Sequence, residues 1–335
     1  MRLNGVSIII CTYNGVERLP KTLDSILQLN PGITRELILV DNASTEDIEG
    51  FCHNYFSENP LKIKFKLVKE NKTGLTHARI AGIMNSRYDY LLFCDDDNSL
   101  SPDYLDFGLE IFEKNENVGI VGGRGIARMT INPPVWFEKY QKSYAVGPQR
   151  LNSGLIDFSP SHVYGAGSFF RRIPMLEILE AGFYPSLIGR TNTTLLSGDD
   201  LEWCWLLQLK GYKIYYEDKL RFYHDLSEQR LNESYYIKLK AGTASGSALL
   251  FAYRTFFKNR NLSVSGFKAS FKMESLKHRL RYYKNRFLIN SKNWENELAL
   301  AILRSRVQSF RRYPVESLKL YSELKRIFFI NNNVQ

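Results

Sequence analysis

The sequence is poor in cysteine and has no long hydrophobic run. Its four cysteines, Cys11, Cys52, Cys94 and Cys204, are scattered and lack the spacing of zinc or redox sites. We therefore expect buried thiols in a reducing compartment. No stretch reaches the roughly 18 apolar residues that a membrane-spanning helix needs. The first residues enter a strand-like run at 6–11 without a basic and then apolar export signal, which favours a cytoplasmic location.

Two common nucleotide-binding motifs are also absent. No G-x-G-x-x-G follows the first apolar run, which argues against a dinucleotide site of the dehydrogenase type. No G-x-x-x-x-G-K-[ST] occurs, which argues against a P-loop nucleotidase. If the protein binds a nucleotide, other residues must hold it.

Apolar runs alternate with amphipathic segments in the first third of the chain. We predict strands at 6–11, 36–40, 65–68 and 90–94, and helices at 19–29, 74–85 and 102–112. This alternation predicts an α/β fold with a mainly parallel central sheet. Polar residues follow three of the strands, so we expect their side chains to converge on one crevice.

A cluster of acidic residues follows the fourth predicted strand. Asp95, Asp96 and Asp97 come directly after the apolar run 91–94. Three adjacent carboxylates repel one another, and this repulsion raises their pKa values. Mg²⁺ or Mn²⁺ would remove the conflict, and Mg²⁺ commonly binds one or two carboxylates together with substrate phosphates. The hypothesis is a metal–diphosphate site, and the alternative is a solvated acidic turn that caps a helix.

A second acidic cluster, formed by Asp199, Asp200 and Glu202, precedes a predicted helix at 203–210. Acidic residues at this position could simply complement the helix dipole, although that explains one of them better than three. His224 ends a later short strand, and an isolated histidine is more often structural than a ligand. The sequence leaves both interpretations of His224 open.

The region between the two acidic clusters is rich in glycine and aromatic residues. Trp136 and Tyr140 belong to an irregular segment at 133–147, and their rings could stack on a sugar or pack in a core. A glycine turn at 165–172 enters a strand, and such turns usually line or cover a site.

The net charge of +10 belongs to the C-terminal part of the chain. Residues 1–257 contain 28 basic and 30 acidic residues, whereas residues 258–335 contain 17 and 5. We expect helices in 231–330, with apolar rows at Leu276, Leu280, Tyr283 and Phe287 and at Leu300, Leu303, Val307 and Phe310. These helices could pack on the rest of the protein, or they could lie on an anionic membrane surface. We expect no nucleic acid partner, because no recognised motif accompanies the charge.

Six motifs in this order resemble those of the family 2 glycosyltransferases, which have the GT-A fold. The resemblance covers roughly residues 5–225. The matching segments are Ser7–Asn14, Val40–Ser44, Gly74 with Ala78–Arg79, Phe93–Asp97, Gly165–Gly167 and Gly198–Glu202. It implies a catalytic domain at 1–230, with a nucleotide-binding half at 1–117 and an acceptor half at 118–230. A helical, basic extension at 231–335 would follow.

The resemblance implies a role for individual residues in binding the nucleotide sugar. These residues are Thr12, Tyr13, Asn14, Asp41, Arg79, Asp95 and Asp96. Asp41 matches the acid that binds the base, and Asp95 lies toward the ribose. Asp97 would hold Mn²⁺ or Mg²⁺, with Asp95 and His224 as further ligands.

The remaining roles concern the acceptor and the chemistry. Asp200 matches the catalytic base, and Asp199 stands where the family usually has glutamate. Trp136, Tyr140 and Gly167 are candidates for binding the acceptor. A single base and a single displacement predict inversion at the anomeric carbon, because no covalent enzyme intermediate is needed.

These expectations combine into a metal-dependent, inverting glycosyltransferase. It would move a sugar from a nucleoside diphosphate sugar, by default UDP-linked, to a glycan or lipid-linked glycan in cell-surface polysaccharide synthesis. Its location would be the cytoplasm or the inner face of the cell membrane. Two alternatives remain, a sugar-nucleotide pyrophosphorylase and a non-catalytic, basic, membrane-associated scaffold. The first should have a glycine-rich basic loop after its first strand, which Thr12–Gly15 does not resemble.

Overall fold

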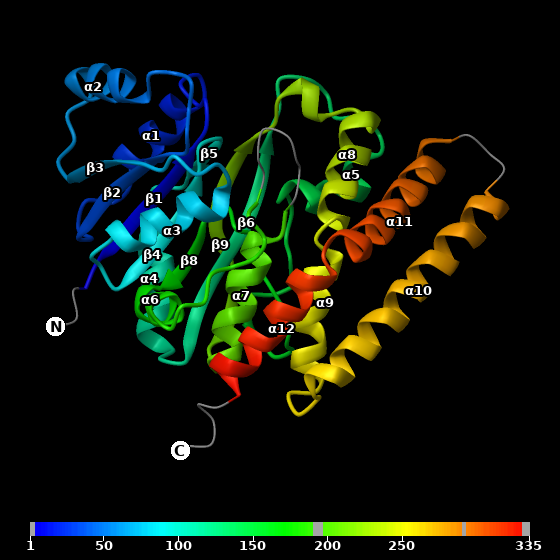
Figure 1. The fold of residues 1–335 in the computed structure, drawn as a ribbon. Coiled ribbons are helices and arrows are strands. Elements are labelled where there is room, and N and C mark those ends of the chain that lie inside the picture. Colours follow the sequence, from blue (N-terminus) through cyan, green and yellow to red (C-terminus); the bar gives the residue numbers. More distant parts are fainter. Residues whose placement is uncertain (1–3, 190–196, 290–292, 330–335) are drawn as a thin grey trace.

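The computed structural model describes residues 4–189, 197–289 and 293–329. Its strands are β1 (Val6–Thr12), β2 (Arg35–Asp41), β3 (Lys64–Lys69), β4 (Tyr90–Asp95), β5 (Asn98–Leu100), β6 (Val118–Arg128), β7 (Gly154–Ile156), β8 (Ser168–Arg171) and β9 (Lys213–Asp225). Within the described residues they form one nine-stranded sheet in the order β3-β2-β1-β4-β8-β6-β9-β5, with β7 paired to β9. The sheet lies on one side of the molecule in Figure 1.

The first four strands in the sequence run parallel to one another. Thr12 at the end of β1 lies opposite Asp41 at the end of β2, and Cys11 lies opposite Asp95 at the end of β4. The three polar strand ends therefore meet at one edge, as the sequence predicts. Beyond β4 the sheet becomes mixed, because β8 pairs antiparallel with both β4 and β6.

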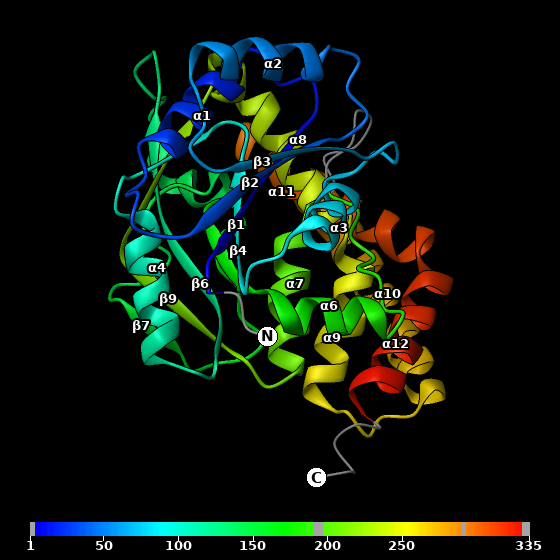
Figure 2. The same cartoon turned by 90° about the vertical axis from the view of Figure 1, so that its left-hand side faces the viewer.

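Helices cover both faces of the sheet. They are α1 (Leu19–Leu27), α2 (Ile48–Glu58), α3 (Leu75–Asn85), α4 (Tyr104–Lys114), α5 (Phe137–Tyr140), α6 (Arg172–Glu180), α7 (Asp199–Leu209), α8 (Glu233–Ala244), α9 (Ser247–Lys258), α10 (Val264–Leu288), α11 (Trp294–Arg312) and α12 (Pro314–Phe328). Two short 3-10 helices are η1 (Gln141–Tyr144) and η2 (Glu228–Arg230). Ile8 and Ile10 of β1 belong to the core with α1, α2 and α4, whereas Ile9 belongs to the core with α3, α6 and α7. Figure 2 shows α4 on one side of the sheet and α3 and α6 on the other.

The C-terminal helices pack on the sheet domain through the second of these cores. Residues of α7, α9 and α12 form one buried apolar cluster, in which Trp203, Tyr253 and Tyr321 are almost completely buried. The ring of Phe183 lies 6.1 Å from that of Phe328, between the centroids. None of the helices in the described parts of the chain combines the length and apolar character that crossing a bilayer requires.

Several elements differ from the sequence prediction, among them the unpredicted β5, β7, α5 and α6, and three further differences have identifiable reasons. β9 is one strand of 13 residues rather than two short ones, because β6 pairs with both halves across a register shift at Gly122 and Arg124. α7 begins at Asp199, so the second acidic cluster lies inside its first turn rather than before it. α2 was not predicted, and its N-cap is Asp47, whose side chain accepts a hydrogen bond from Gly50 N.

Candidate active site

Asn14 joins the first two strand ends. Its backbone is left-handed, with φ of +49°, and its side-chain oxygen accepts a hydrogen bond from Thr45 N at 2.8 Å. The carboxylate of Asp41 accepts another from Ser44 N at 3.0 Å. Because Thr12 lies opposite Asp41 in the sheet, three of the predicted nucleotide-binding residues share one small region. Their contact with a nucleotide stays a prediction.

The three aspartates that follow β4 have different partners. Asp96 accepts hydrogen bonds from Thr12 Oγ1 at 2.6 Å and from Arg18 Nη2 at 2.7 Å. The same guanidinium donates to the carbonyl oxygen of Tyr13, so it also fixes the first loop. Burial raises the pKa of Asp96 above its ordinary value, although the hydrogen bond from Arg18 opposes this shift.

Asp97 points toward the end of β9. β5 pairs antiparallel with β9, which places His224 beside the acidic turn. Asp97 Oδ2 lies 3.4 Å from His224 Nε2 and 2.9 Å from Arg230 Nη1. Burial opposes ionisation, but the charges of His224 and Arg230 hold the pKa of Asp97 below its ordinary value. His224 Nδ1 lies 2.7 Å from the carbonyl oxygen of Tyr144, which can only accept, so this nitrogen carries a proton.

Asp95 belongs to a third group of contacts, which connects the two acidic clusters. Its carboxylate lies 3.5 Å from Arg79 Nη2, and the other guanidinium nitrogen, Nη1, pairs with Asp199. The side chain of Arg79 is 5% exposed, and its guanidinium lies 5.2 Å from the centroid of the Phe93 ring. β4 and the first turn of α7 are therefore joined by one buried cation. The sequence predicts their meeting but not this role for Arg79.

Each of the three aspartates has a basic partner, which offsets part of their mutual repulsion. The charge of Asp97 still raises the pKa of Asp96. Two of the partners, Arg18 and Arg230, were not predicted. Arg18 lies four residues after Asn14 and donates a hydrogen bond to the carbonyl oxygen of Asn14. Its short distance from the first loop in the sequence could have indicated it. Nothing in the local sequence indicates Arg230, because tertiary packing brings it to Asp97.

The donor atoms beside Asp97 fit a divalent cation only in part. In the described residues no group of three or more His, Cys, Asp or Glu side chains is arranged to hold a metal ion. Asp97 Oδ2 and His224 Nε2 do face one point, which is taken by Arg230 Nη1 at 2.9 and 3.3 Å. Two such ligands suit an ion that also binds substrate phosphates. A metal would therefore fit here once Arg230 has moved.

Asp200 is the member of the second cluster that stays partly exposed. Its Oδ2 accepts a hydrogen bond from Gly165 N at 3.2 Å. A Cβ atom at Gly165 would lie 2.7 Å from the Cβ of Asp200 and 3.1 Å from Arg79 Nη2, so only glycine allows this approach. Gly167 has φ of +65° and packs on Tyr104, whose hydroxyl donates to its carbonyl oxygen at 2.6 Å. The predicted contact of Gly167 with an acceptor stays a prediction.

Glu202 has a structural position. Its carboxylate accepts hydrogen bonds from Ser186 N at 2.8 Å, from Leu187 N at 2.7 Å and from the hydroxyl of Tyr253. Burial raises the pKa of Glu202 to about 7, although these hydrogen bonds oppose the shift. Glu202 thus fastens the chain before α7 to α9.

Trp136 and Tyr140 lie in an aromatic cluster with the C-terminal helices. The ring centroid of Trp136 is 5.7 Å from that of Trp294, and the centroid of Tyr140 is 4.9 Å from that of Tyr236. The hydroxyl of Tyr140 also donates to Glu295 at 3.0 Å. These contacts agree with the packing interpretation. Both side chains remain partly exposed, so the predicted contact with a sugar stays open.

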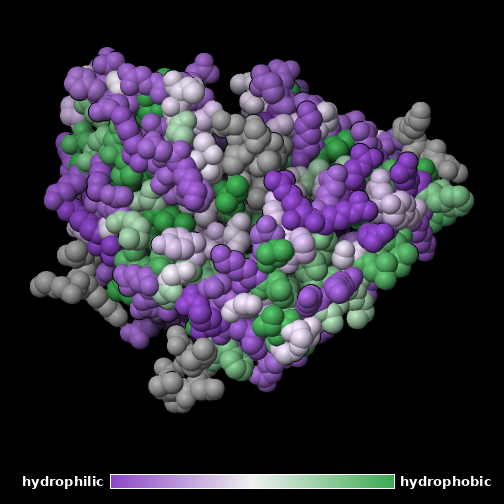
Figure 3. All heavy atoms as spheres, in the orientation of Figure 1, coloured by the Kyte–Doolittle hydropathy of each residue, from purple (hydrophilic) through white to green (hydrophobic). Residues whose placement is uncertain are grey.

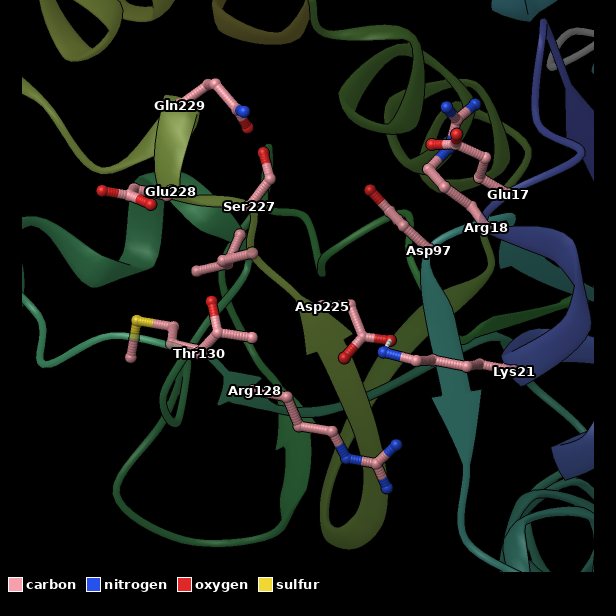
Figure 4. A pocket seen from close by; sticks show the side chains of 12 residues that line it. Glu17, Arg18, Lys21, Asp97, Arg128, Thr130, Asp225, Ser227, Glu228 and Gln229 are labelled. Carbon is pink, nitrogen blue, oxygen red and sulfur yellow. Dashed lines mark ion pairs between the residues drawn. The ribbon is translucent and has the colours of Figure 1, made fainter.

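A cavity of about 630 Å³ opens beside Asp97. It is lined by Glu17, Arg18, Lys21, Asp97, Arg128, Met129, Thr130, Asp225, Leu226, Ser227, Glu228 and Gln229. Figure 4 shows these side chains around the opening, with Lys21 and Asp225 paired at 3.6 Å across it. The cavity brings polar groups from α1, β6 and β9 to the same crevice, and its basic residues were not predicted.

Comparison with known proteins gives one family. The sequence model of Glycosyl transferase family 2 matches residues 7–179. The chain is 22% identical over 228 residues to the Glucosyl-dolichyl phosphate glucuronosyltransferase of Haloferax volcanii, and the match covers 67% of this chain and 70% of that protein. It is 22% identical over 215 residues to the Poly-beta-1,6-N-acetyl-D-glucosamine synthase of Staphylococcus aureus, covering 64% of this chain and 48% of that protein.

A solved structure shares the fold. It is the crystal structure of S. aureus TarS 1-349 in complex with UDP-GlcNAc, with a TM-score of 0.51 and 14% sequence identity. The superposition covers 98% of this chain and 92% of that chain. The C-terminal helices therefore lie within the region that is compared.

Proposed function

Because the chain belongs to glycosyl transferase family 2, and is therefore a glycosyltransferase with the GT-A fold, we propose that it moves a sugar from a nucleoside diphosphate sugar to a hydroxyl of a glycan or lipid-linked glycan. The observation that carries this proposal is the meeting of both acidic clusters on Arg79. Uridine is the proposed base, since the TarS structures contain UDP and UDP-GlcNAc. Cell-surface polysaccharide synthesis is the proposed process, since the relatives are named for transfer to a lipid-linked sugar and for polysaccharide synthesis.

The nucleotide would bind at the joined ends of β1 and β2. Thr12, Tyr13, Asn14 and Asp41 are proposed to contact the base and ribose, and the arrangement of Asn14 and Asp41 supports this. Arg79, Asp95 and Asp96 would complete the donor site. In this proposal residues 1–117 form the nucleotide half, 118–230 the acceptor half and 231–335 the helical extension.

Asp200 is proposed as the general base. An acceptor hydroxyl must lose its proton as it attacks the sugar, and a carboxylate at hydrogen-bond distance can take that proton. Asp199 is paired with buried Arg79, whereas Asp200 is partly exposed and held only by backbone N–H groups in the described contacts. Attack from the side opposite the diphosphate inverts the anomeric carbon. Trp136, Tyr140 and Gly167 are proposed to position the acceptor.

Asp97 and His224, with Asp95, are proposed to hold Mn²⁺ or Mg²⁺. A divalent ion at this place would neutralise the charge of the departing diphosphate. The convergence of Asp97 Oδ2 and His224 Nε2 on Arg230 Nη1 supports the assignment. Arg230 holds the two side chains in position and must turn away when a cation binds.

The location proposed is the cytoplasm, at or near the inner face of the cell membrane. A lipid-linked acceptor would be found at that face. The basic helical extension would make the contact with an anionic leaflet.

The transferase proposal is tested by replacing the base. Asp200→Asn should lower the rate of sugar transfer by about 10²- to 10⁴-fold, because a general base contributes that much. It should leave UDP affinity, measured by calorimetry, unchanged. The donor is first chosen from a thermal-shift panel of UDP-, GDP- and dTDP-sugars with Mn²⁺. Asp157→Asn, at an exposed position, is the matched control. Near-normal turnover of Asp200→Asn would refute the base assignment.

The metal proposal has a readout that does not require turnover. Arg230→Gln removes the competing cation, so it should raise Mn²⁺ affinity about tenfold in the absence of donor, measured by electron paramagnetic resonance. Asp97→Asn should weaken Mn²⁺ binding, and Arg124→Gln should leave it unchanged, because Arg124 pairs with Asp218 outside these contacts. Equal Mn²⁺ affinity in Arg230→Gln and the unaltered protein would contradict the proposal.

A further inference from the structure

The outer face of α10 has a row of exposed apolar side chains. Met273, Leu276, Leu280, Tyr283 and Phe287 follow one another at intervals of three or four residues, and they are 51–84% exposed. At about 100° per residue, these five positions fall within a stripe of about 80° on the helix surface. Figure 3 shows hydrophobic residues along the edge of the molecule at which Figure 1 places α10.

The row is separate from the face that anchors the helix. Phe267 and Phe271 of α10 are buried, and Phe267 stacks on Tyr321 with ring centroids 4.2 Å apart. Phe271 lies 4.8 Å from Phe310 of α11, again between centroids. α10 therefore already has an apolar face in the core. Its outer row is a second apolar face, and no contact with the described residues buries it.

Basic residues border the row on both sides. Around the helix, Lys277, Arg281 and Lys284 lie beyond one edge of the stripe, and Lys268, Lys272, Arg279 and Arg286 lie beyond the other. All seven are exposed. The only acidic residue in α10 is Glu274, which pairs with Lys277 and His278 and lies outside the stripe. An apolar stripe between two basic edges is typical of helices that lie in a membrane interface.

We propose that this face of α10 lies on an anionic phospholipid surface. The apolar row would enter the boundary between headgroups and acyl chains, while the seven cations contact headgroup phosphates. Charge favours lipid over a second copy of this chain, because a symmetric contact would bring the same basic edges together. The inference deepens the membrane association proposed above by naming the surface, and it does not depend on which sugar is transferred.

Vesicle flotation tests the proposal with the whole chain described above. Vesicles of phosphatidylcholine alone are compared with vesicles that contain about 30 mol% phosphatidylglycerol, at low and high salt. At low salt the protein should bind the anionic vesicles at least about tenfold more strongly than the vesicles of phosphatidylcholine alone. High salt should weaken the binding to the anionic vesicles. Absence of binding to anionic vesicles, or binding that salt does not change, would overturn the proposal.

Two triple variants separate the apolar and electrostatic contributions. The apolar variant is Leu276→Ser, Leu280→Ser and Phe287→Ser, and the charge variant is Lys272→Gln, Arg279→Gln and Arg286→Gln. Each should lose at least about tenfold in binding to anionic vesicles while keeping the circular dichroism spectrum of the unaltered protein. Wild-type binding by both would overturn the proposal.

Matched controls change exposed residues elsewhere. They are Val135→Ser with Leu151→Ser for the apolar row and Lys62→Gln with Lys64→Gln and Lys213→Gln for the charges. Both controls should bind vesicles like the unaltered protein. A loss of binding in the controls equal to that in the α10 variants would mean that no particular face is used, and it would overturn the assignment to α10.

Two further measurements complete the test. Sedimentation velocity without lipid shows whether the apolar row joins two copies of the chain. If the unaltered protein forms a dimer that the apolar variant does not form, and if it binds no vesicles, the row is a self-association surface and the lipid proposal is wrong. UDP binding of all variants should be unchanged. If the unaltered protein binds anionic vesicles but transfers no sugar, the transferase proposal is refuted and the lipid proposal stands.

Discussion

Charged residues differ in burial and pairing between the crevice at the strand ends and the outer face of α10. In the crevice, charges are buried or half-buried and paired with residues far away in the sequence, as Arg79 is with Asp95 and Asp199. On α10, the cations are exposed and lie beside apolar side chains within the same few turns. Removing one charged side chain should therefore lower the free energy of unfolding strongly in the crevice and hardly at all on α10.

The largest expected effect is that of Arg79→Met. It leaves Asp199 buried without its partner, so the free energy of unfolding should fall by about 3–5 kcal/mol in chemical denaturation. Arg124→Met breaks the ion pair between Arg124 and Asp218, whose side chains are 39% and 36% exposed, respectively. This change should lower the free energy of unfolding by only about 0–1 kcal/mol. Equal losses in the two variants would remove the distinction between the crevice and the surface.

Glu202 gives a pH-dependent version of the same comparison. Its pKa is about 7 in the folded protein against an ordinary 4.5, so the folded state binds the additional proton between these values. Stability from this group is therefore present at low pH and is lost as pH rises from about 4.5 to 7, by about 3 kcal/mol. Glu202→Gln cannot ionise, and thermal unfolding across this pH range should lose that slope. An unchanged slope would mean that another group titrates.

Gly165→Ala should have an intermediate effect. The new Cβ would meet Asp200 and Arg79 in a tightly packed place, so stability should fall by about 1–3 kcal/mol and sugar transfer should fall with it. Gly32→Ala is the control, because a Cβ atom at Gly32 would have no neighbouring atom within 4 Å. If Gly165→Ala behaves like Gly32→Ala, the approach of Gly165 to Asp200 is not constrained.

The smallest expected effect is on the outer face of α10. Leu280→Ser should change the free energy of unfolding by no more than about 0.5 kcal/mol, because Leu280 is 61% exposed. Phe271→Ala, on the buried face of the same helix, should cost about 3–5 kcal/mol. Denaturation of the two variants compares the faces directly. A large loss for Leu280→Ser would show that its side chain contributes to the core.

Much of the fold follows from local patterns. Continuous apolar runs are typical of buried parallel strands, and they predicted the positions of β1, β2 and β4. α2 could also have been predicted, from Asp47 as an N-cap and from apolar residues at Ile48, Phe51, Cys52 and Tyr55. β9 could not, because the polar residues at 217–219 interrupt its apolar pattern where the register with β6 shifts.

The site was less predictable than the fold. The order of the motifs identified the family, and family membership bears out a glycosyltransferase rather than a pyrophosphorylase or a scaffold. The order of the motifs did not indicate that Arg79 would be buried between Asp95 and Asp199, or that Arg230 would face Asp97. Partners of buried charges are selected by three-dimensional packing, which a linear motif does not record.

The position of Arg230 has a consequence for the chain that leads to it. His224 is the second-last residue of β9, and Arg230 lies beside it again after only five intervening residues, 225–229. This short connection limits where Arg230 can lie, and α8 begins soon after it, at Glu233. Inserting a single residue into this connection would therefore misplace the guanidinium while leaving the side chains of Asp97 and His224 chemically intact.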